Sequence, residues 1–162
     1  METDNLNVEV TKELLEQLAL IFKNREANMR MRMRAFLDHT LYLYQITPRA
    51  VLPHGSCQYS PTIKSPGCAI GMFMHIDHCL EADELQLSAK TLARNYKEFL
   101  PDWMQDFGGR FLRQIQGFHD ESKNWLKVDL PEWRHNLVTI DGQLKYNTII
   151  LKINRGDFDG HV

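Results

Sequence analysis

The sequence predicts a mainly α fold, α+β at most, in which residues 1–162 form a single compact helical bundle with a short β-hairpin. Three observations predict this class. A length of 162 residues fits one domain. An apolar content of 43% with 25% charged residues is typical of a soluble globular protein. Apolar residues recur at spacings of three and four through most of the chain, which is the period of amphipathic helices.

The first half of the chain carries two helical patterns. An apolar face over residues 10–22 predicts the first helix, and an apolar stripe over residues 29–44 predicts the second. The second helix is expected to end before Pro48, because proline disfavours helical backbone at the preceding residue. A short connection near Asn24 would let the two helices pack antiparallel.

The second half continues with helices. Residues 85–99 carry a helical stripe, with Ser88 as an internal start. A stronger helix is expected from Pro101 through residue 118, where Gly108 and Gly109 suggest the close approach of a neighbouring backbone. We expect this helix to lie at the centre of the core.

The C-terminal region fits two structures. Asp141-Gly142 between apolar runs is a common hairpin signal, whereas Leu144, Thr148 and Leu151 suit a terminal helix ended by Gly156. The helix is slightly favoured, because the basic residues then lie away from the apolar side or at the helix end.

Charge argues against nucleic acid as a partner. The net charge is −2, so the chain lacks the basic excess that phosphate binding usually shows. One basic segment, residues 23–34, is the exception: on the second helix Arg30 and Arg34 flank the apolar stripe, and Arg32 is expected to point away from it. This segment is either a solvated flank of a core helix or a contact surface for an acidic partner or for phosphate, including that of a nucleic acid.

All three cysteines lie within residues 57–79, and their role stays open among four interpretations. Prolines and Gly67 predict a β-hairpin around residues 57–68, followed by a helix from Cys68. One interpretation is structural packing at this junction. A Cys57–Cys68 disulfide is a second. The longest apolar stretches are only a few residues, so neither a secretory signal nor a membrane span is expected. A cytoplasmic location is therefore expected, and together with the odd number of cysteines it favours reduced thiols.

A zinc site is the third interpretation, and it is the only cofactor that the residues suggest. Its candidate ligands are Cys57, Cys68, His75 and Cys79. On one continuous helix Cys68 and His75 would be roughly 10 Å apart along the axis, so a shared ion requires a helix break between them, near Gly71.

A catalytic thiol is the fourth interpretation. Cys68 at a helix N-terminus would be a nucleophile with a lowered pKa, and His119 is the best candidate for its base. Asp120 is not expected to orient His119, because adjacent helical residues point about 100° apart. The alternative for His119 is a packing or capping role at a helix C-terminus.

The segments "CQY", "GCAIGMF" and "LRQIQGFHDESKNW" resemble a family of small uncharacterised proteins encoded by phages, prophages and other bacterial mobile elements. The resemblance covers roughly residues 50–125. Met72 departs from it, where relatives often have a further cysteine, and so does Ile115, where leucine is usual. The resemblance implies an accessory protein of a mobile element and no particular activity. The matching positions are Cys57, Tyr59, Gly67, Cys68, Ala69, Ile70, Gly71, Ile115, Gln116, His119, Asp120 and Trp125.

Two functions follow as expectations. The first is a non-enzymatic binding protein that engages a host protein or a small ligand, with homo-oligomerisation left open; the second is a cysteine-dependent hydrolase or transferase that uses Cys68 and His119. Tyr, Trp, Met and Arg are enriched at the cores of interfaces. The candidate binding residues are Met31 and Tyr42, which lie off the core stripe, the flanking Arg30 and Arg34, and the motif residues Tyr59, Asp120 and Trp125.

Overall fold

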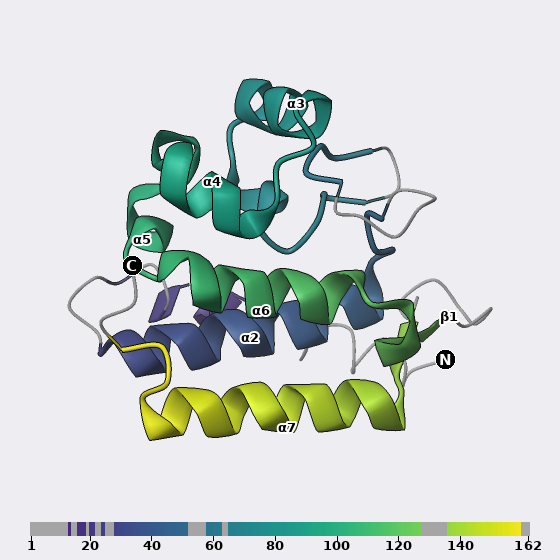
Figure 1. Cartoon of the computed structure of the whole chain (residues 1–162). Coiled ribbons are helices and arrows are strands. Elements are labelled where there is room, and N and C mark those ends of the chain that lie inside the picture. The colour runs from purple at the N-terminus through teal and green to yellow at the C-terminus, as the bar shows by residue number, and fades with distance from the viewer. Residues whose placement is uncertain are drawn as a thin grey trace.

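The computed structural model describes residues 13, 16–18, 20–21, 24, 28–51, 58–62, 65–127 and 136–159. Figure 1 shows their arrangement, which confirms the predicted mainly α fold; β1 and β2 form a two-stranded antiparallel hairpin. The elements in chain order are α2 (Met29–Ile46), η1 (Gly71–Phe73), α3 (Ile76–Glu84), α4 (Ala89–Asn95), η2 (Lys97–Phe99), α5 (Asp102–Gln105), α6 (Gly108–Asp120), η3 (Ser122–Asn124), β1 (Trp125–Lys127), β2 (Asn136–Val138) and α7 (Ile140–Arg155).

Helix α6 lies at the centre of the bundle, as predicted. In Figure 1 it runs between α4 on one side and α2 and α7 on the other, and it contacts all three. A Cβ atom on Gly109 would lie 3.5 Å from the Cα of Lys90 in α4, which confirms the predicted close approach of a neighbouring backbone. The inward side of α6 is fully buried and consists of Phe111, Leu112, Ile115 and Phe118.

The long helix predicted from Pro101 is two helices instead. Pro101 precedes the four-residue α5 as its N-cap, and α6 begins only at Gly108. Gly108 has φ +77°, a left-handed conformation that glycine adopts readily and that interrupts an α-helix. The prediction of one continuous helix is therefore wrong, because Gly108 turns the chain between α5 and α6.

Helix α2 begins and ends close to the predicted bounds. Asn28 caps it, since its side chain accepts a hydrogen bond of 2.8 Å from the backbone N–H of Arg30. Thr47 has an extended backbone, as expected before Pro48. Of the helix predicted over residues 10–22, positions 13, 16–18, 20 and 21 are helical, and the others lie outside the described residues.

Helix α7 resolves the ambiguity at the C-terminal region in favour of the helix. Thr139 caps its start, and Gly156 ends it with φ +80°. The Asp141-Gly142 pair lies in the first turn of α7 rather than in a hairpin. A Cβ on Gly142 would lie only 2.2 Å from the backbone oxygen of Asn124, so this glycine is required by packing and not by a turn.

The β1–β2 hairpin closes the bundle against the end of α2. Trp125 pairs with Val138, and Asn136 is buried. The side-chain amide of Asn136 donates to the backbone oxygens of Tyr44 at 2.6 Å and Thr47 at 3.2 Å. These two hydrogen bonds connect the hairpin to carbonyls at the C-terminal end of α2, which have no partner within the helix.

The segment between α2 and α3 differs from its prediction. Its two arms fold back on each other, with backbone hydrogen bonds from Thr62 to Ser65 (2.8 Å) and from Cys68 to Gln58 (2.9 Å), but residues 58–62 and 65–68 contain no strand. The helix predicted from Cys68 is also wrong. The chain makes a turn and the short η1 first, and α3 starts at Ile76 with His75 as its N-cap.

Candidate functional site

The C-terminal turn of α6 holds the histidine that the sequence singled out. His119 is fully buried, and its Nδ1 lies 2.8 Å from Oδ1 of Asp120. The same oxygen accepts a hydrogen bond of 2.7 Å from the side chain of Gln116. The expectation that Asp120 would not easily orient His119 is wrong, because Asp120 is the last residue of α6 and its carboxylate contacts both His119 and Gln116 of the final turn.

The burial of His119 favours the neutral form of its ring. Burial lowers the pKa of His119, while the hydrogen bond to Asp120 and its charge act in the opposite direction. A neutral ring that donates from Nδ1 to Asp120 leaves Nε2 as an acceptor. Within the described residues three buried acceptor atoms around this turn have no hydrogen-bond partner: His119 Nε2, Gln116 Oε1 and Asn124 Oδ1.

Tyr44 joins the end of α6 to the loop before α3. Its ring meets the ring of His119 edge-on, with 4.4 Å between centroids, and its hydroxyl donates to the backbone oxygen of Gly67 at 2.7 Å. Burial raises the pKa of Tyr44, and the nearby Asp120 raises it further. Arg49, just after α2, also contacts the end of α6, since its guanidinium donates to the backbone oxygen of His119 at 2.6 Å.

The loop around Tyr59 packs backbone against backbone. A Cβ on Gly71 would lie 2.2 Å from the backbone oxygen of Tyr59, and a Cβ on Gly67 would lie 2.5 Å from it. Tyr59 itself is buried, and its hydroxyl donates to the backbone oxygen of Leu87 at 2.8 Å. These contacts leave room only for glycine at both positions, and they gather the motif residues of the loop into one packed unit.

Asp83 fixes this loop to α3. Its carboxylate accepts from the backbone N–H groups of Tyr59 (2.7 Å) and Ser60 (3.0 Å) and from the hydroxyl of Ser60 (2.5 Å). Hydrogen bonds to a carboxylate are stronger than those between neutral groups. This role was not predictable from the sequence, because Asp83 resembles any other acidic residue on the surface of a helix.

The cysteines do not form the predicted catalytic centre. Cys68 is fully buried and disulfide-bonded, so its sulfur is no thiolate, and no helix starts at this residue. The expectation of three reduced thiols is therefore wrong for Cys68. Cys79 is free and buried, and burial together with Asp83 raises the pKa of its thiol to about 11. Cys57 lies outside the described residues.

Among the proposed zinc ligands that the structure describes, Cys68, His75 and Cys79 form no metal-binding group. The predicted break near Gly71 exists, but the Cys79 thiol contacts the backbone oxygen of Gly71 at 3.2 Å, while His75 is exposed and caps α3. The Nδ1 atom of His75 accepts a hydrogen bond from the backbone N–H of Asp77 at 3.2 Å. In the part of the chain that the structure describes, no group of three or more His, Cys, Asp or Glu residues is arranged to hold a metal ion.

The arginines of α2 have three different environments. Arg30 forms an ion pair of 2.5 Å with Asp159 and donates to the backbone oxygen of Asn154, so it attaches the end of the chain to α2. Arg34 is exposed. Arg32, expected to point away from the core, is only 4% exposed: its guanidinium lies 5.5 Å from the ring centroid of Phe107 and near Asp106.

The remaining candidate binding residues are mostly inside. Met31 is 54% exposed, and Tyr42 is half-buried against the core. Tyr59 and Trp125 are buried, and the indole N–H of Trp125 donates to the backbone oxygen of Phe118 at 3.0 Å. Asp120 is partly buried in its contact with His119. Direct partner contact is therefore open to Met31 and Arg34 but not to Tyr59 or Trp125.

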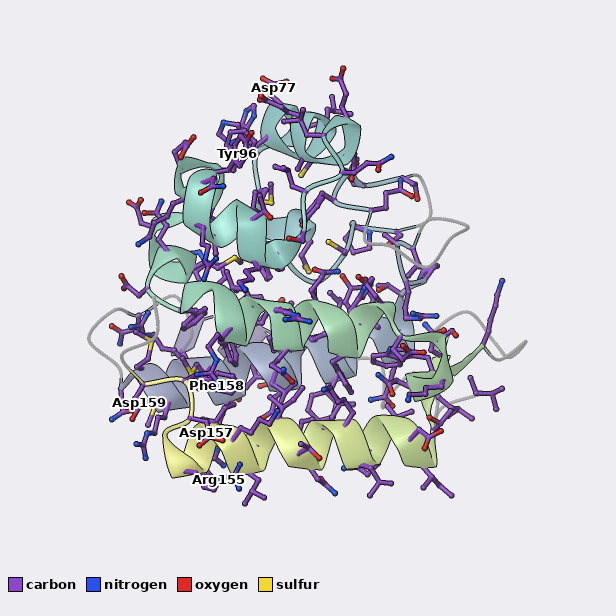
Figure 2. The ribbon with its side chains drawn as sticks, in the orientation of Figure 1. Asp77, Tyr96, Arg155, Asp157, Phe158 and Asp159 are labelled. Carbon is purple, nitrogen blue, oxygen red and sulfur yellow. The ribbon has the colours of Figure 1, made fainter. Side chains whose placement is uncertain are left out.

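The outer face of α3 is an exposed surface that the sequence analysis missed. Only Cys79 and Ala82 of this helix are buried. Ile76 is 44% exposed and Leu80 55%, one helical turn apart, and the acidic residues Asp77, Glu81 and Glu84 lie beside them. Figure 2 shows Asp77 at the edge of the molecule, on the far side of α3 from α6. An apolar pair at spacing four inside an acidic run was the available signal.

A pocket of about 420 Å³ lies between the end of α6 and the first turns of α7. Lys123 and Lys145 line it together with Glu121 and Asp141, so both signs of charge are present. Burial lowers the pKa of Lys145, whose amine donates to the side chain of Gln114. Gly117 faces the pocket without a neighbouring atom.

Comparison of the chain with models of protein families, with curated proteins and with solved structures gives no match. The resemblance to the phage and mobile-element family therefore stays a prediction. Within the described residues, no helix combines the length and the apolar character that crossing a bilayer requires.

Proposed function

We propose that the protein is a non-enzymatic binding protein, an accessory factor of a phage or mobile element, that engages a host protein through the outer face of α3. The observation that carries the proposal is the exposure of Ile76 and Leu80 among acidic side chains on a helix with only two buried residues. Leu85, just after the helix, adds a third exposed apolar side chain, at 49%.

The charge of this region favours a basic partner. Residues 65–89 contain four acidic side chains and no lysine or arginine. One of the four, Asp83, is used internally, whereas Asp77, Glu81 and Glu84 are exposed. We therefore expect a partner surface with an apolar groove and a basic rim, which would accept α3 as a helix laid into a groove.

The scaffold behind α3 supports a presenting role. Asp83 fixes the helix to the Tyr59 loop, and the ring of His78 stacks on Phe99 with 4.4 Å between centroids. The helix is thus held in place before any partner binds, which reduces the ordering cost of association. The cysteine-dependent alternative is not favoured, because Cys68 is disulfide-bonded and both Cys68 and His119 are fully buried.

The test is affinity capture from a bacterial host lysate with the immobilised full chain and two α3 variants. Ile76→Ser with Leu80→Ser is expected to abolish capture of the specific partner. Glu81→Lys with Glu84→Lys is expected to weaken it, and the purified partner is expected to bind the wild-type chain less tightly at high salt. Met31→Ser, an equally exposed apolar side chain on α2, is the matched control and is expected to retain the partner.

Two outcomes would overturn the proposal. One is a partner that is retained by both α3 variants. The other is a partner that is lost with Met31→Ser and retained by the α3 variants, which would place the contact on α2. Thermal unfolding of each variant shows whether the capture results refer to folded protein.

A further inference from the structure

Helix α7 carries a second exposed apolar stripe, on the side opposite its buried residues. Gly142, Ile149 and Ile153 are the buried residues of this helix. On the outer side Ile140 is 83% exposed, Leu144 58% and Leu151 54%. An isolated exposed leucine needs no explanation, but three such residues along one line of one helix form a surface.

The spacing of this stripe is that of a coiled-coil seam. Ile140, Leu144, Asn147 and Leu151 follow one another at steps of four, three and four, and all four are exposed. This is the alternation of d and a positions in a heptad. Asn147 is the polar member, and a single polar residue in such a seam is a known device for fixing register.

The flanking charges show which partner fits the stripe. Asp141 lies beside Ile140 at the start of α7, and Arg155 lies at its end; both are exposed. Figure 2 shows Arg155 on the outer side of α7, near Asp157, with which it forms an ion pair of 2.8 Å. An identical helix laid antiparallel brings Asp141 of each copy next to Arg155 of the other.

We propose that the outer face of α7 binds the same face of a second copy of this chain in an antiparallel, two-fold symmetric dimer. In this register Leu144 packs on Leu151 of the other copy twice, and Asn147 lies near the two-fold axis. Two Asp141–Arg155 contacts then close the ends, and the antiparallel helix dipoles attract each other. Lys145 does not oppose the contact, because its amine is directed toward Gln114 of α6.

One helix pair makes a small interface. The seam from Ile140 to Leu151 is about 17 Å long at about 1.5 Å per residue. A contact of this size lies at the lower end of specific interfaces, so we expect a reversible monomer–dimer equilibrium with a dissociation constant on the order of micromolar.

The experiment is sedimentation velocity of the full chain from about 1 µM to about 200 µM, a range that brackets a micromolar equilibrium. The wild-type chain is expected to shift from monomer to dimer with concentration. Leu144→Glu is expected to weaken association at least about tenfold, because it buries two charges in the seam. Leu80→Glu on α3, at nearly the same exposure, is the matched control and is expected to dimerise like the wild type.

A charge exchange tests the antiparallel orientation. Asp141→Arg alone and Arg155→Asp alone each place like charges at both ends of the seam, and each is expected to weaken the dimer about threefold. The double variant restores opposite charges and is expected to dimerise like the wild type. In a parallel pair these positions do not meet, so the double variant would not recover.

Three results would overturn the proposal. The first is a chain that stays monomeric over the whole concentration range. The second is a dimer that survives Leu144→Glu, and the third is a double variant that associates no better than the single variants. A dimer that is lost with Leu80→Glu and kept with Leu144→Glu is a case of the second result and would place self-association on α3, whereas host-partner binding by α3 is tested separately by affinity capture.

Discussion

The C-terminal turn of α6 and the outer face of α3 both carry charged and polar side chains, but in opposite settings. Around α6, His119 and Asp120 contact each other in the interior, and Tyr44 connects them to the loop before α3. On α3, Glu81 and Glu84 face solvent without an ion pair among the described residues. Removing a buried side chain that makes hydrogen bonds leaves its partners unsatisfied and destabilises a fold, whereas truncating an exposed polar side chain changes stability little. The difference indicates that the first region maintains the fold and the second is available for binding.

The largest expected effect on stability is that of Gly71→Ala, in the loop before α3. Gly71→Ala places a Cβ 2.2 Å from the backbone oxygen of Tyr59 and 2.5 Å from its Cα, and backbone cannot move aside as a side chain can. We expect a loss of about 3 kcal/mol in the free energy of unfolding, measured with urea.

Gly117→Ala is the matched control for this substitution. Its Cβ would meet no atom within 4 Å, and it lies in the interior of α6. It is expected to stabilise the protein by about 0.5 to 1 kcal/mol. Equal effects of the two substitutions would contradict the packing assigned to the loop.

Tyr44→Phe removes a single hydroxyl and tests the hydrogen bond between α2 and the loop before α3. The carbonyl of Gly67 loses a buried donor that now lies 2.7 Å away, so we expect a loss of about 1 to 2 kcal/mol in unfolding free energy. Tyr42→Phe is the control, because no hydrogen bond of the Tyr42 hydroxyl is seen within the described residues, and we expect it to change stability by less than about 0.5 kcal/mol. A neutral Tyr44→Phe would show that this region does not hold the fold together.

The pH dependence of stability distinguishes the buried histidine from the exposed ones. Burial lowers the pKa of His119 in the folded state below its value in the unfolded chain, which is about 6.5. The unfolded state therefore binds the proton first, so stability is complete above about pH 6.5 and falls as the pH drops toward the folded-state pKa. The loss between pH 7 and 5 is expected to be smaller in His119→Gln. An unchanged pH profile in this variant would assign the acid sensitivity to other groups.

The smallest expected effect on stability is on α3. Leu80→Ser alters a side chain that is 55% exposed, so the unfolding free energy is expected to change by less than about 0.5 kcal/mol. A loss as large as that of Tyr44→Phe would show that α3 depends on Leu80 for its own packing. The contrast between the two regions would then disappear.

Local signals predicted much of the fold. Pro48 ended α2, Ser88 capped α4 and Gly156 ended α7, because each of these residues acts within one turn of its own position. Features that depend on contacts between residues distant in the sequence could not be predicted. Arg32 is buried because its guanidinium packs against the ring of Phe107 and lies near Asp106. Gly142 lies in the first turn of α7, where a Cβ would be 2.2 Å from the backbone oxygen of Asn124.

The candidate site was predicted less well for the same reason. The density of cysteine and histidine suggested a reaction centre, but the motif residues meet as a packed unit in which glycines approach the backbone of Tyr59. Residue types alone do not show that Gly67 and Gly71 lie against the backbone of Tyr59. The acidic face of α3 was readable as a helical pattern, but only its exposure makes it a candidate surface.

Partner capture by Tyr44→Phe and by Ile76→Ser with Leu80→Ser, compared at a temperature where both variants are folded, tests the central claim most directly. The contrast between the two regions predicts that Tyr44→Phe, although less stable, captures the partner as the wild type does. The α3 variant is expected to keep wild-type stability and lose the partner. The reverse result, in which capture is lost with Tyr44→Phe and kept by the α3 variant, would contradict the assignment of binding to α3.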